Sequence, residues 1–259
     1  MIYRAKPADG VSWVTGASSG IGRATARELA RRGFTVAATA RTTEALDALA
    51  GEARGGSGRI IGHPCDVTDT AAMERCVAAI EIAHGPIALA FLNAGIAPYV
   101  RAATLDVEAF RKTFEVNVFG VINGLTPVLS RMAERKRGQI AVNASIAGYT
   151  GLPKATAYGA SKAAAIHMCE ALKFDCDQLG VTLQVVNPGF IETPLTAKND
   201  FPMPFLMGEE EAARRIVDGF ARGGFEITFP KRLALITKLG RILPYSLYFY
   251  LIKKVTGAG

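Results

Sequence analysis

The chain has 259 residues, 49% of them hydrophobic, and its formal net charge at pH 7 is +7. A chain of this length can bury one large core, and no Pro/Ser-rich linker or internal repeat divides it, so we expect one domain and exclude a repeat architecture. The positive charge could serve nucleic-acid binding, but no groove-reading motif accompanies it, and no nucleic-acid partner is expected.

The N-terminus shows no secretory stretch. Residues 1–10 are polar, and the first hydrophobic run, Val11-Ser12-Trp13-Val14, predicts a short buried strand. The cysteines form no Cys-x-x-Cys pair and have no histidine at metal spacing, which predicts reduced packing residues, no metal site and a cytoplasmic setting. They are Cys65, Cys76, Cys169 and Cys176.

A glycine-rich turn follows the first predicted strand. Thr15-Gly16-Ala17-Ser18-Ser19-Gly20-Ile21-Gly22 leads into residues 24–30, which have helical composition. Three glycines let the backbone turn tightly, approach a pyrophosphate and aim helix N-terminal amides at its charge. Such a loop could be merely a turn, but its place between a strand and a helix favours nucleotide binding.

Strand-like runs recur along the chain, separated by segments long enough for helices. They cover residues 35–39, 59–65, 89–93, 139–144, 182–187 and 226–229. This alternation predicts an α/β fold, a Rossmann-like doubly wound parallel sheet with helices on both faces and ligands at the carboxyl ends of its strands. The glycine turn, Asn93, Ser145 and residues 187–189 all fall at such ends.

The end of the second strand bears on the choice of cofactor. A carboxylate there would bind the ribose hydroxyls of NAD and repel a 2′-phosphate, but the run Ala38-Thr39-Ala40-Arg41 contains none. Arg41 can pair with the phosphate and stack near the adenine, although it could also be an arginine on a solvated loop. The run favours NADP(H) and leaves NAD(H) possible.

Tyr158 and Lys162 lie four residues apart, so on a helix they project from one face. A cation beside a phenol favours the phenolate and lowers the phenol pKa toward neutral pH, which suits a proton donor. The spacing alone would also fit an ordinary surface pair.

Together these motifs resemble those of the short-chain dehydrogenase/reductase family in its single-domain form, up to about Pro230. The family's glycine signature matches residues 15–22, its Asn-Ala-Gly matches Asn93-Ala94-Gly95, and its Tyr-x-x-x-Lys matches Tyr158 and Lys162. Its catalytic serine matches Ser145, its catalytic asparagine matches Asn117, and its loop after the sixth strand matches residues 187–193.

The resemblance implies hydride transfer between a nicotinamide and a carbonyl or alcohol. Tyr158 would exchange the proton on the substrate oxygen, which Ser145 would hold. Lys162 would lower the phenol pKa and bind the nicotinamide ribose, and Asn117 would hold a relay water. A catalytically silent nucleotide-sensing or scaffold protein on the same fold is the alternative, and the complete tetrad argues against it.

The resemblance also implies a set of cofactor contacts. Asp66 resembles the family's adenine-contacting aspartate, although it could equally cap the next helix. The expected contacts are Gly16, Ser18, Ser19, Gly20, Ile21, Gly22, Arg41, Asp66, Val67, Asn93, Ala94, Gly95, Tyr158, Lys162, Pro188, Gly189, Ile191 and Thr193.

Residues 194–207 correspond to the family's mobile lid over the substrate. Their apolar content suggests a hydrophobic substrate, with Tyr149, Phe190, Phe201 and Phe205 lining its pocket. The same side chains could instead belong to the core. The sequence does not choose among 3-oxoacyl thioesters, steroids or retinoids, and long-chain keto-lipids.

Residues 231–259 form a basic, apolar extension of the domain that residues 1–230 build. As a helix, its first part places Leu233, Ile236, Leu239, Ile242 and Leu243 on one face and Thr237, Lys238 and Arg241 on another, until Pro244 interrupts. The apolar runs are shorter than the ~18 residues of a transmembrane span. Contact with a membrane surface, packing on another subunit and packing over the substrate cleft all remain open.

Finally, the resemblance implies a homodimer or homotetramer. The long helices expected at about 105–134 and 155–179 would build it. Their apolar positions Phe110, Phe114, Val118, Ile122, Ala163, Ile166 and Phe174 could face a partner instead of the sheet.

Overall fold

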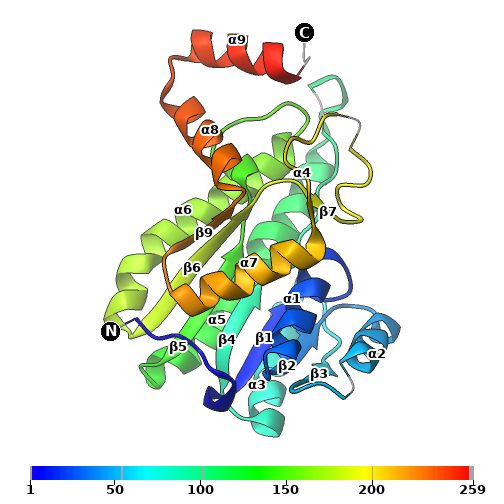
Figure 1. The fold of residues 1–259 in the computed structure, drawn as a ribbon, viewed down its shortest axis with the longest axis vertical. Coiled ribbons are helices and arrows are strands. Elements are labelled where there is room, and N and C mark those ends of the chain that lie inside the picture. The colour runs from blue at the N-terminus through cyan, green and yellow to red at the C-terminus, as the bar shows by residue number, and fades with distance from the viewer. Residues whose placement is uncertain (1, 54, 101, 200, 257–259) are drawn as a thin grey trace.

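The computed structural model describes residues 2–53, 55–100, 102–199 and 201–256. Its central element is a parallel sheet in the order β3-β2-β1-β4-β5-β6-β9 (Figure 1). The strands are β1 (Val11–Thr15), β2 (Thr35–Thr39), β3 (Arg59–Gly62), β4 (Ile87–Leu92), β5 (Gly138–Asn143), β6 (Val181–Pro188) and β9 (Glu226–Phe229). The predicted Rossmann-like, doubly wound sheet is confirmed.

Helices cover both faces of this sheet. The longer helices are α1 (Gly20–Arg31), α2 (Thr43–Glu52), α3 (Thr70–His84), α4 (Val107–Phe114), α5 (Gly120–Glu134), α6 (Thr156–Gln178), α7 (Glu209–Arg222), α8 (Lys231–Ile242) and α9 (Tyr245–Thr256). Helices α1, α2 and α7 share one hydrophobic cluster, whereas α3, α5 and α6 share the other. Two short strands, β7 (Ile191–Glu192) and β8 (Met207–Gly208), pair beside the sheet.

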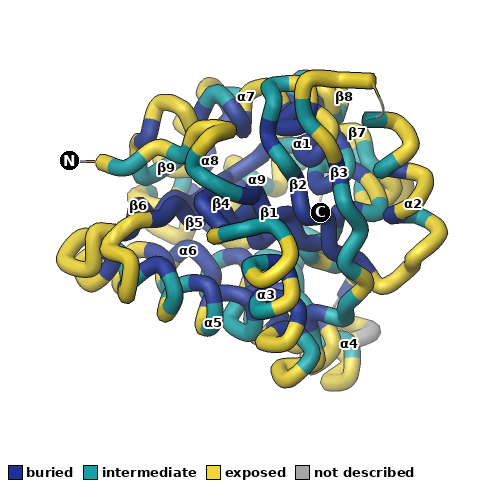
Figure 2. Tube along the Cα trace, turned by 90° about the horizontal axis from the view of Figure 1, so that it is seen from below, coloured by how far each residue is buried: buried dark blue, intermediate teal, exposed yellow. Residues whose placement is uncertain are grey.

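The burial of the central strands explains their composition. Every residue of β4, β5 and β6 is buried, and Figure 2 shows these strands in dark blue in the interior of the molecule. A strand covered on both faces has no solvated side, so β4 is apolar throughout instead of alternating, and the polar residues of β5 and β6 need buried partners. The buried amides Gln139 and Gln184 satisfy each other, Nε2 of Gln139 donating to Oε1 of Gln184 over 2.6 Å.

The strand order reverses between β1 and β4, and this point positions the site. The chain runs outward from β1 to β3 and then returns to β4 on the other side of β1. Connections therefore diverge above the carboxyl ends of these two strands and leave a crevice. Thr15 joins the two ends, since its Oγ1 accepts hydrogen bonds from the backbone amides of Asn93 (2.9 Å) and Ala94 (3.2 Å).

Most of the apolar face predicted for α8 points away from the domain, and only Leu233 of that face is buried. The predicted apolar face of α8 is exposed at Ile236, Leu239 and Ile242, whereas its polar side lies on the domain. Lys238 pairs with Glu226 of β9, and Arg241 Nη1 donates to the backbone oxygen of Tyr149 over 2.9 Å. The half-buried Glu226 and the buried backbone beside it need polar partners, which the polar side of α8 supplies.

These contacts lead us to propose that residues 231–256 belong to the same domain as the sheet. Leu233 and Ala234 are buried in the hydrophobic cluster on the α3, α5 and α6 side, and Tyr248 of α9 is 5% exposed. Among the described residues, no helix is long and apolar enough to cross a membrane.

Candidate active site

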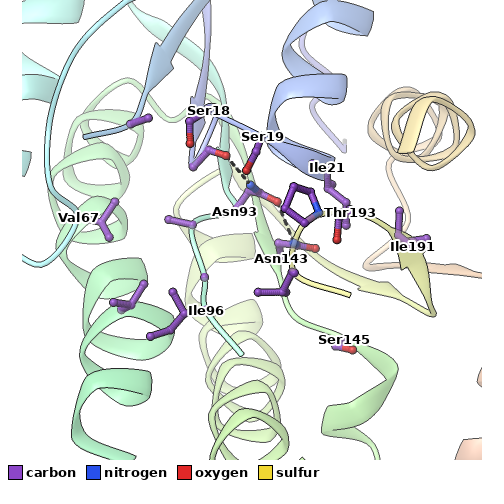
Figure 3. A pocket seen from close by; sticks show the side chains of 18 of the residues that line it. Ser18, Ser19, Ile21, Val67, Asn93, Ile96, Asn143, Ser145, Ile191 and Thr193 are labelled. Carbon is purple, nitrogen blue, oxygen red and sulfur yellow. Dashed lines mark hydrogen bonds between the residues drawn. The ribbon is translucent and has the colours of Figure 1, made fainter. Parts of the chain in front are cut away.

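A cavity of about 510 Å³ lies above the carboxyl ends of the strands. Figure 3 shows Ser18, Ser19 and Ile21 in one part of it and Ser145 in another, with Asn93 and Asn143 between them. Seventeen of the eighteen expected cofactor contacts line the cavity together with Ser145, and only Gly22 is absent from the lining.

The glycine turn fits a dinucleotide closely. Gly16 has a φ of +67°, and a Cβ at this position would lie 2.7 Å from the Cα of Ala94. Gly22 lies behind the cavity, where a Cβ would come within 2.3 Å of the backbone oxygen of Gly16. Ser19 precedes α1 without a side-chain cap, so the first amides of the helix are available to a pyrophosphate.

Two asparagines at neighbouring strand ends form the floor of the cavity. Asn93 Nδ2 donates to the backbone oxygen of Thr15 over 3.1 Å, and Asn143 Nδ2 donates to Asn93 Oδ1 over 2.9 Å. Asn143 Oδ1 is buried and has no partner among the described residues, so it can accept a hydrogen bond from a bound ligand. Sequence reasoning missed Asn143, although it ends β5 much as Asn93 follows β4.

Arg41 and Asp66 lie where the chain leaves β2 and β3. Arg41 is exposed on the cavity lining and forms no ion pair within the described part of the chain. Asp66 Oδ1 accepts from the backbone amide (3.0 Å) and hydroxyl (2.9 Å) of Thr68, so it caps a turn. The cap of α3 is Asp69 instead, which accepts from the amide of Ala72.

Three of the four predicted catalytic residues share this cavity. Ser145, Tyr158 and Lys162 line it, and Lys162 Nζ lies 5.7 Å from the Tyr158 ring centroid. Nζ donates to the backbone oxygen of Asn143 over 2.6 Å. Ser145 Oγ accepts from the amide of Ala147 over 3.1 Å, which fixes the hydroxyl at the end of β5.

Asn117, the fourth, is buried behind the cavity and does not line it. It lies in a π-helical turn, Glu115–Phe119, between α4 and α5. Its Oδ1 accepts from the backbone amide of Ile96 (2.8 Å), and its Nδ2 donates to Ser161 Oγ (3.0 Å). The side chain therefore joins the loop after β4 to α6, the helix that carries Tyr158.

The expected lowering of the Tyr158 pKa by Lys162 is not seen in this structure. Burial raises the pKa of Tyr158, and the hydroxyl of Ser145 beside it acts in the opposite direction. Burial also lowers the pKa of Lys162 to about 8, because this residue is 3% exposed and its ammonium has no carboxylate beside it within the described residues. Both groups therefore favour their neutral forms more than they would in water.

The lowered pKa of Lys162 predicts how the free energy of unfolding depends on pH. From about pH 8 to 10.5 the unfolded lysine keeps its proton and the folded one loses it, so the free energy of unfolding rises with pH. Relative to Lys162→Met, the cofactor-free wild type should gain on the order of 3 kcal/mol across this window. Melting curves of the wild type and Lys162→Met across this pH range check the prediction, because the titrations of all other groups are common to both proteins and cancel in the difference. A pH-independent difference would contradict a buried ammonium.

The four predicted substrate-pocket residues are not on the cavity lining. Tyr149 is buried under α8, with its hydroxyl donating to Glu226 Oε1 over 2.5 Å. Phe190 and Phe201 pack edge to face with centroids 5.9 Å apart, and Phe205 is exposed. The apolar and cationic side chains that do line the cavity near the lid and the loop after β4 are Ile96, Lys112, Val116, Pro194 and Leu195.

This fold and this cavity define a Rossmann-type nucleotide-binding oxidoreductase. A model of the short chain dehydrogenase family matches residues 11–202 of the chain. The protein therefore belongs to the short-chain dehydrogenase/reductase family, and the family prediction from its motifs is confirmed.

Individual relatives agree with this assignment. The chain is 39% identical over 235 residues to an uncharacterized oxidoreductase of Myxococcus xanthus, covering 91% of this chain and 93% of the relative. It is 35% identical over 188 residues to the 3-oxoacyl-(acyl-carrier-protein) reductase of Thermotoga maritima, covering 73% and 76%. A structure of an actinorhodin polyketide ketoreductase variant with NADPH has a TM-score of 0.79 at 28% identity and covers 89% of this chain and 99% of that chain.

Proposed function

We propose that the protein is an NADPH-dependent reductase of a ketone on a hydrophobic substrate. The observation that carries this proposal is one cavity lined by Ser145, Tyr158 and Lys162 and also by Arg41. Arg41 follows β2 and Ser145 follows β5, which stand three strands apart in the sheet. An extended dinucleotide suits a site of this length at the carboxyl ends of the strands.

The bound nicotinamide would supply the hydride that reaches the carbonyl carbon. Tyr158 would donate its phenolic proton to the carbonyl oxygen, and its raised pKa keeps the phenol protonated at neutral pH. Ser145 Oγ would donate a hydrogen bond to the same oxygen as negative charge develops there. The ammonium of Lys162 would stabilise the phenolate that remains on Tyr158.

An assay with ketones tests this function. NADPH oxidation should be faster for ketones of increasing chain length, because a longer apolar chain buries more surface at the lid. Leu195, which lines the cavity and is 41% exposed, offers such a surface. A catalytically silent protein would bind NADPH and oxidise it with none of the ketones.

The cofactor preference is tested by changing the end of β2. Arg41→Ala should raise the KM for NADPH about 10-fold or more, since a charged hydrogen bond is worth roughly 1.5–3 kcal/mol, and leave that for NADH nearly unchanged. Adding Ala40→Asp should shift kcat/KM toward NADH, because the carboxylate repels a 2′-phosphate. Arg75→Ala, exposed on α3, is the matched control. A wild type that already prefers NADH would overturn the proposal.

We also propose a homodimer or homotetramer that uses α4, α5 and α6. Phe119 and Phe174 are 52% and 74% exposed, which is unusual for phenylalanine on a solvated helix. Of the positions predicted to face a partner, Ile166 is buried in the monomer and is excluded. Light scattering should give a dimer or tetramer for the wild type and a smaller species for Phe174→Glu. A monomeric wild type at micromolar concentration would contradict this proposal.

A further inference from the structure

The two C-terminal helices carry an unusual share of the exposed apolar surface. Of the 21 large hydrophobic side chains exposed in the described part of the chain, ten lie on α8 and α9. We call these ten residues the tail surface. They are Leu235, Ile236, Leu239, Ile242, Tyr245, Leu247, Phe249, Tyr250, Leu251 and Val255.

The outward direction of this surface is fixed by contacts on the other side of the helices. Lys238 and Arg241 of α8 are held by Glu226 and by the backbone of Tyr149, and Tyr248 of α9 donates to the backbone oxygen of Gly151. Rotating α8 to bury its apolar face would leave Glu226 without its cation. The tail surface is therefore a built feature of the fold, and α9 stands at one end of the molecule, away from the sheet (Figure 1).

The charged side chains of the tail itself all have one sign. Residues 231–259 hold six basic side chains and no acidic one. Within the described chain, Lys231, Arg232, Lys253 and Lys254 form no ion pair, and all four are exposed. Lys253 and Lys254 follow Tyr250 by three and four residues, so they flank this exposed ring on one helix face.

We propose that the tail surface binds the surface of an anionic lipid bilayer. Aliphatic and aromatic side chains would enter the boundary between headgroups and acyl chains, where tyrosine is favoured, and the unpaired lysines would meet the phosphates. A second copy of the chain is the competing occupant. A two-fold contact through this surface would bring together two sets of the four unpaired cations, with no acidic residue in either tail, which opposes it.

The tail also borders the substrate end of the cavity. A Cβ on Gly189, which lines the cavity, would lie 2.9 Å from Pro230 Cδ and 3.3 Å from Leu233 Cδ2. Docking would thus hold the cavity beside the bilayer. If the proposed function is right, a hydrophobic ketone could then reach the site from the lipid.

Co-sedimentation of the full-length protein with vesicles tests the proposal. At low salt, the wild type should bind anionic vesicles made of phosphatidylcholine and phosphatidylglycerol. It should bind vesicles of phosphatidylcholine alone much more weakly. Lys253→Glu with Lys254→Glu should weaken binding about 10-fold or more and reduce its salt dependence. Phe249→Ser with Tyr250→Ser should remove the part of the binding that resists salt.

Two control variants match these changes elsewhere on the surface. Arg59→Glu with Arg75→Glu makes the same change in net charge, and Ile82→Ser removes a side chain that is 87% exposed on α3. Both should bind vesicles as the wild type does. Equal losses in a control and its matched tail variant would show that binding is unspecific and overturn the proposal.

Activity and oligomeric state are measured on the same samples. The tail variants should reduce a water-soluble ketone at the wild-type rate, which separates failure of the lipid site from failure of the proposed function. A wild type that ignores anionic vesicles at low salt would overturn the lipid proposal. If, in addition, Phe249→Ser with Tyr250→Ser lowered the mass in light scattering, the surface would be an interface between copies.

Discussion

Tyr158→Phe should lower kcat by about 10²–10⁴-fold, the usual contribution of a positioned general acid. The phenylalanine keeps the ring and its packing, so NADPH should still bind with nearly the wild-type Kd. The variant should lower kcat because the proton moves only in the reaction, whereas we propose that the glycine turn and the asparagines at the strand ends hold the cofactor.

Stopped-flow or steady-state NADPH oxidation gives kcat, and fluorescence titration gives the Kd. Tyr245→Phe is the control, since it also removes one phenolic hydroxyl but from a side chain that is 79% exposed on α9. Retention of more than about a tenth of the wild-type turnover would mean that another group donates the proton.

Gly22→Ala should weaken NADPH binding and lower the melting temperature together. The added Cβ would lie 2.3 Å from the backbone oxygen of Gly16 and 2.5 Å from Asn93 Nδ2, so the glycine turn must move. Overpacking of this kind costs roughly 1–3 kcal/mol. In a chain of this size each kcal/mol lowers the melting temperature by about 2–4 °C.

Gly51→Ala supplies the comparison, because Gly51 also lies in a helix but a Cβ there would meet nothing within 4 Å. It should leave NADPH binding unchanged and stabilise the protein slightly, since alanine favours a helix by up to about 1 kcal/mol. Thermal melting and NADPH titration of both variants decide the matter. Equal behaviour of the two would show that the turn tolerates a Cβ.

The sheet could be predicted because burial on two faces makes the inner strands rich in apolar residues, as in β1 and β4. β2 and β9 begin and end where the sequence predicts, whereas β3 ends at Gly62, three residues early. The positions of Ser145, Tyr158 and Lys162 followed from motif spacing. Their electrostatics did not, because the Lys162 pKa depends on desolvation by residues distant in sequence.

The tail shows what periodicity cannot decide. A helical pattern separates α8 into an apolar and a polar face, but it does not say which face the domain binds. Glu226 decides this, because its half-buried carboxylate attracts Lys238 and its neighbour Tyr149 offers a backbone oxygen to Arg241. The contacts of Tyr149 with Glu226 and Arg241 keep its side chain off the lining of the cavity.

The hydrogen bonds from Arg241 and Tyr248 end on the backbone oxygens of Tyr149 and Gly151, in the segment that begins at Ser145. The tail and the active site thus share one stretch of backbone. Suppose that a ligand bound to the tail changes the affinity of the enzyme for substrate by some factor. Bound substrate must then change the affinity of the enzyme for that ligand by the same factor. With such coupling, the fraction of the enzyme bound to a bilayer would change with the substrate concentration.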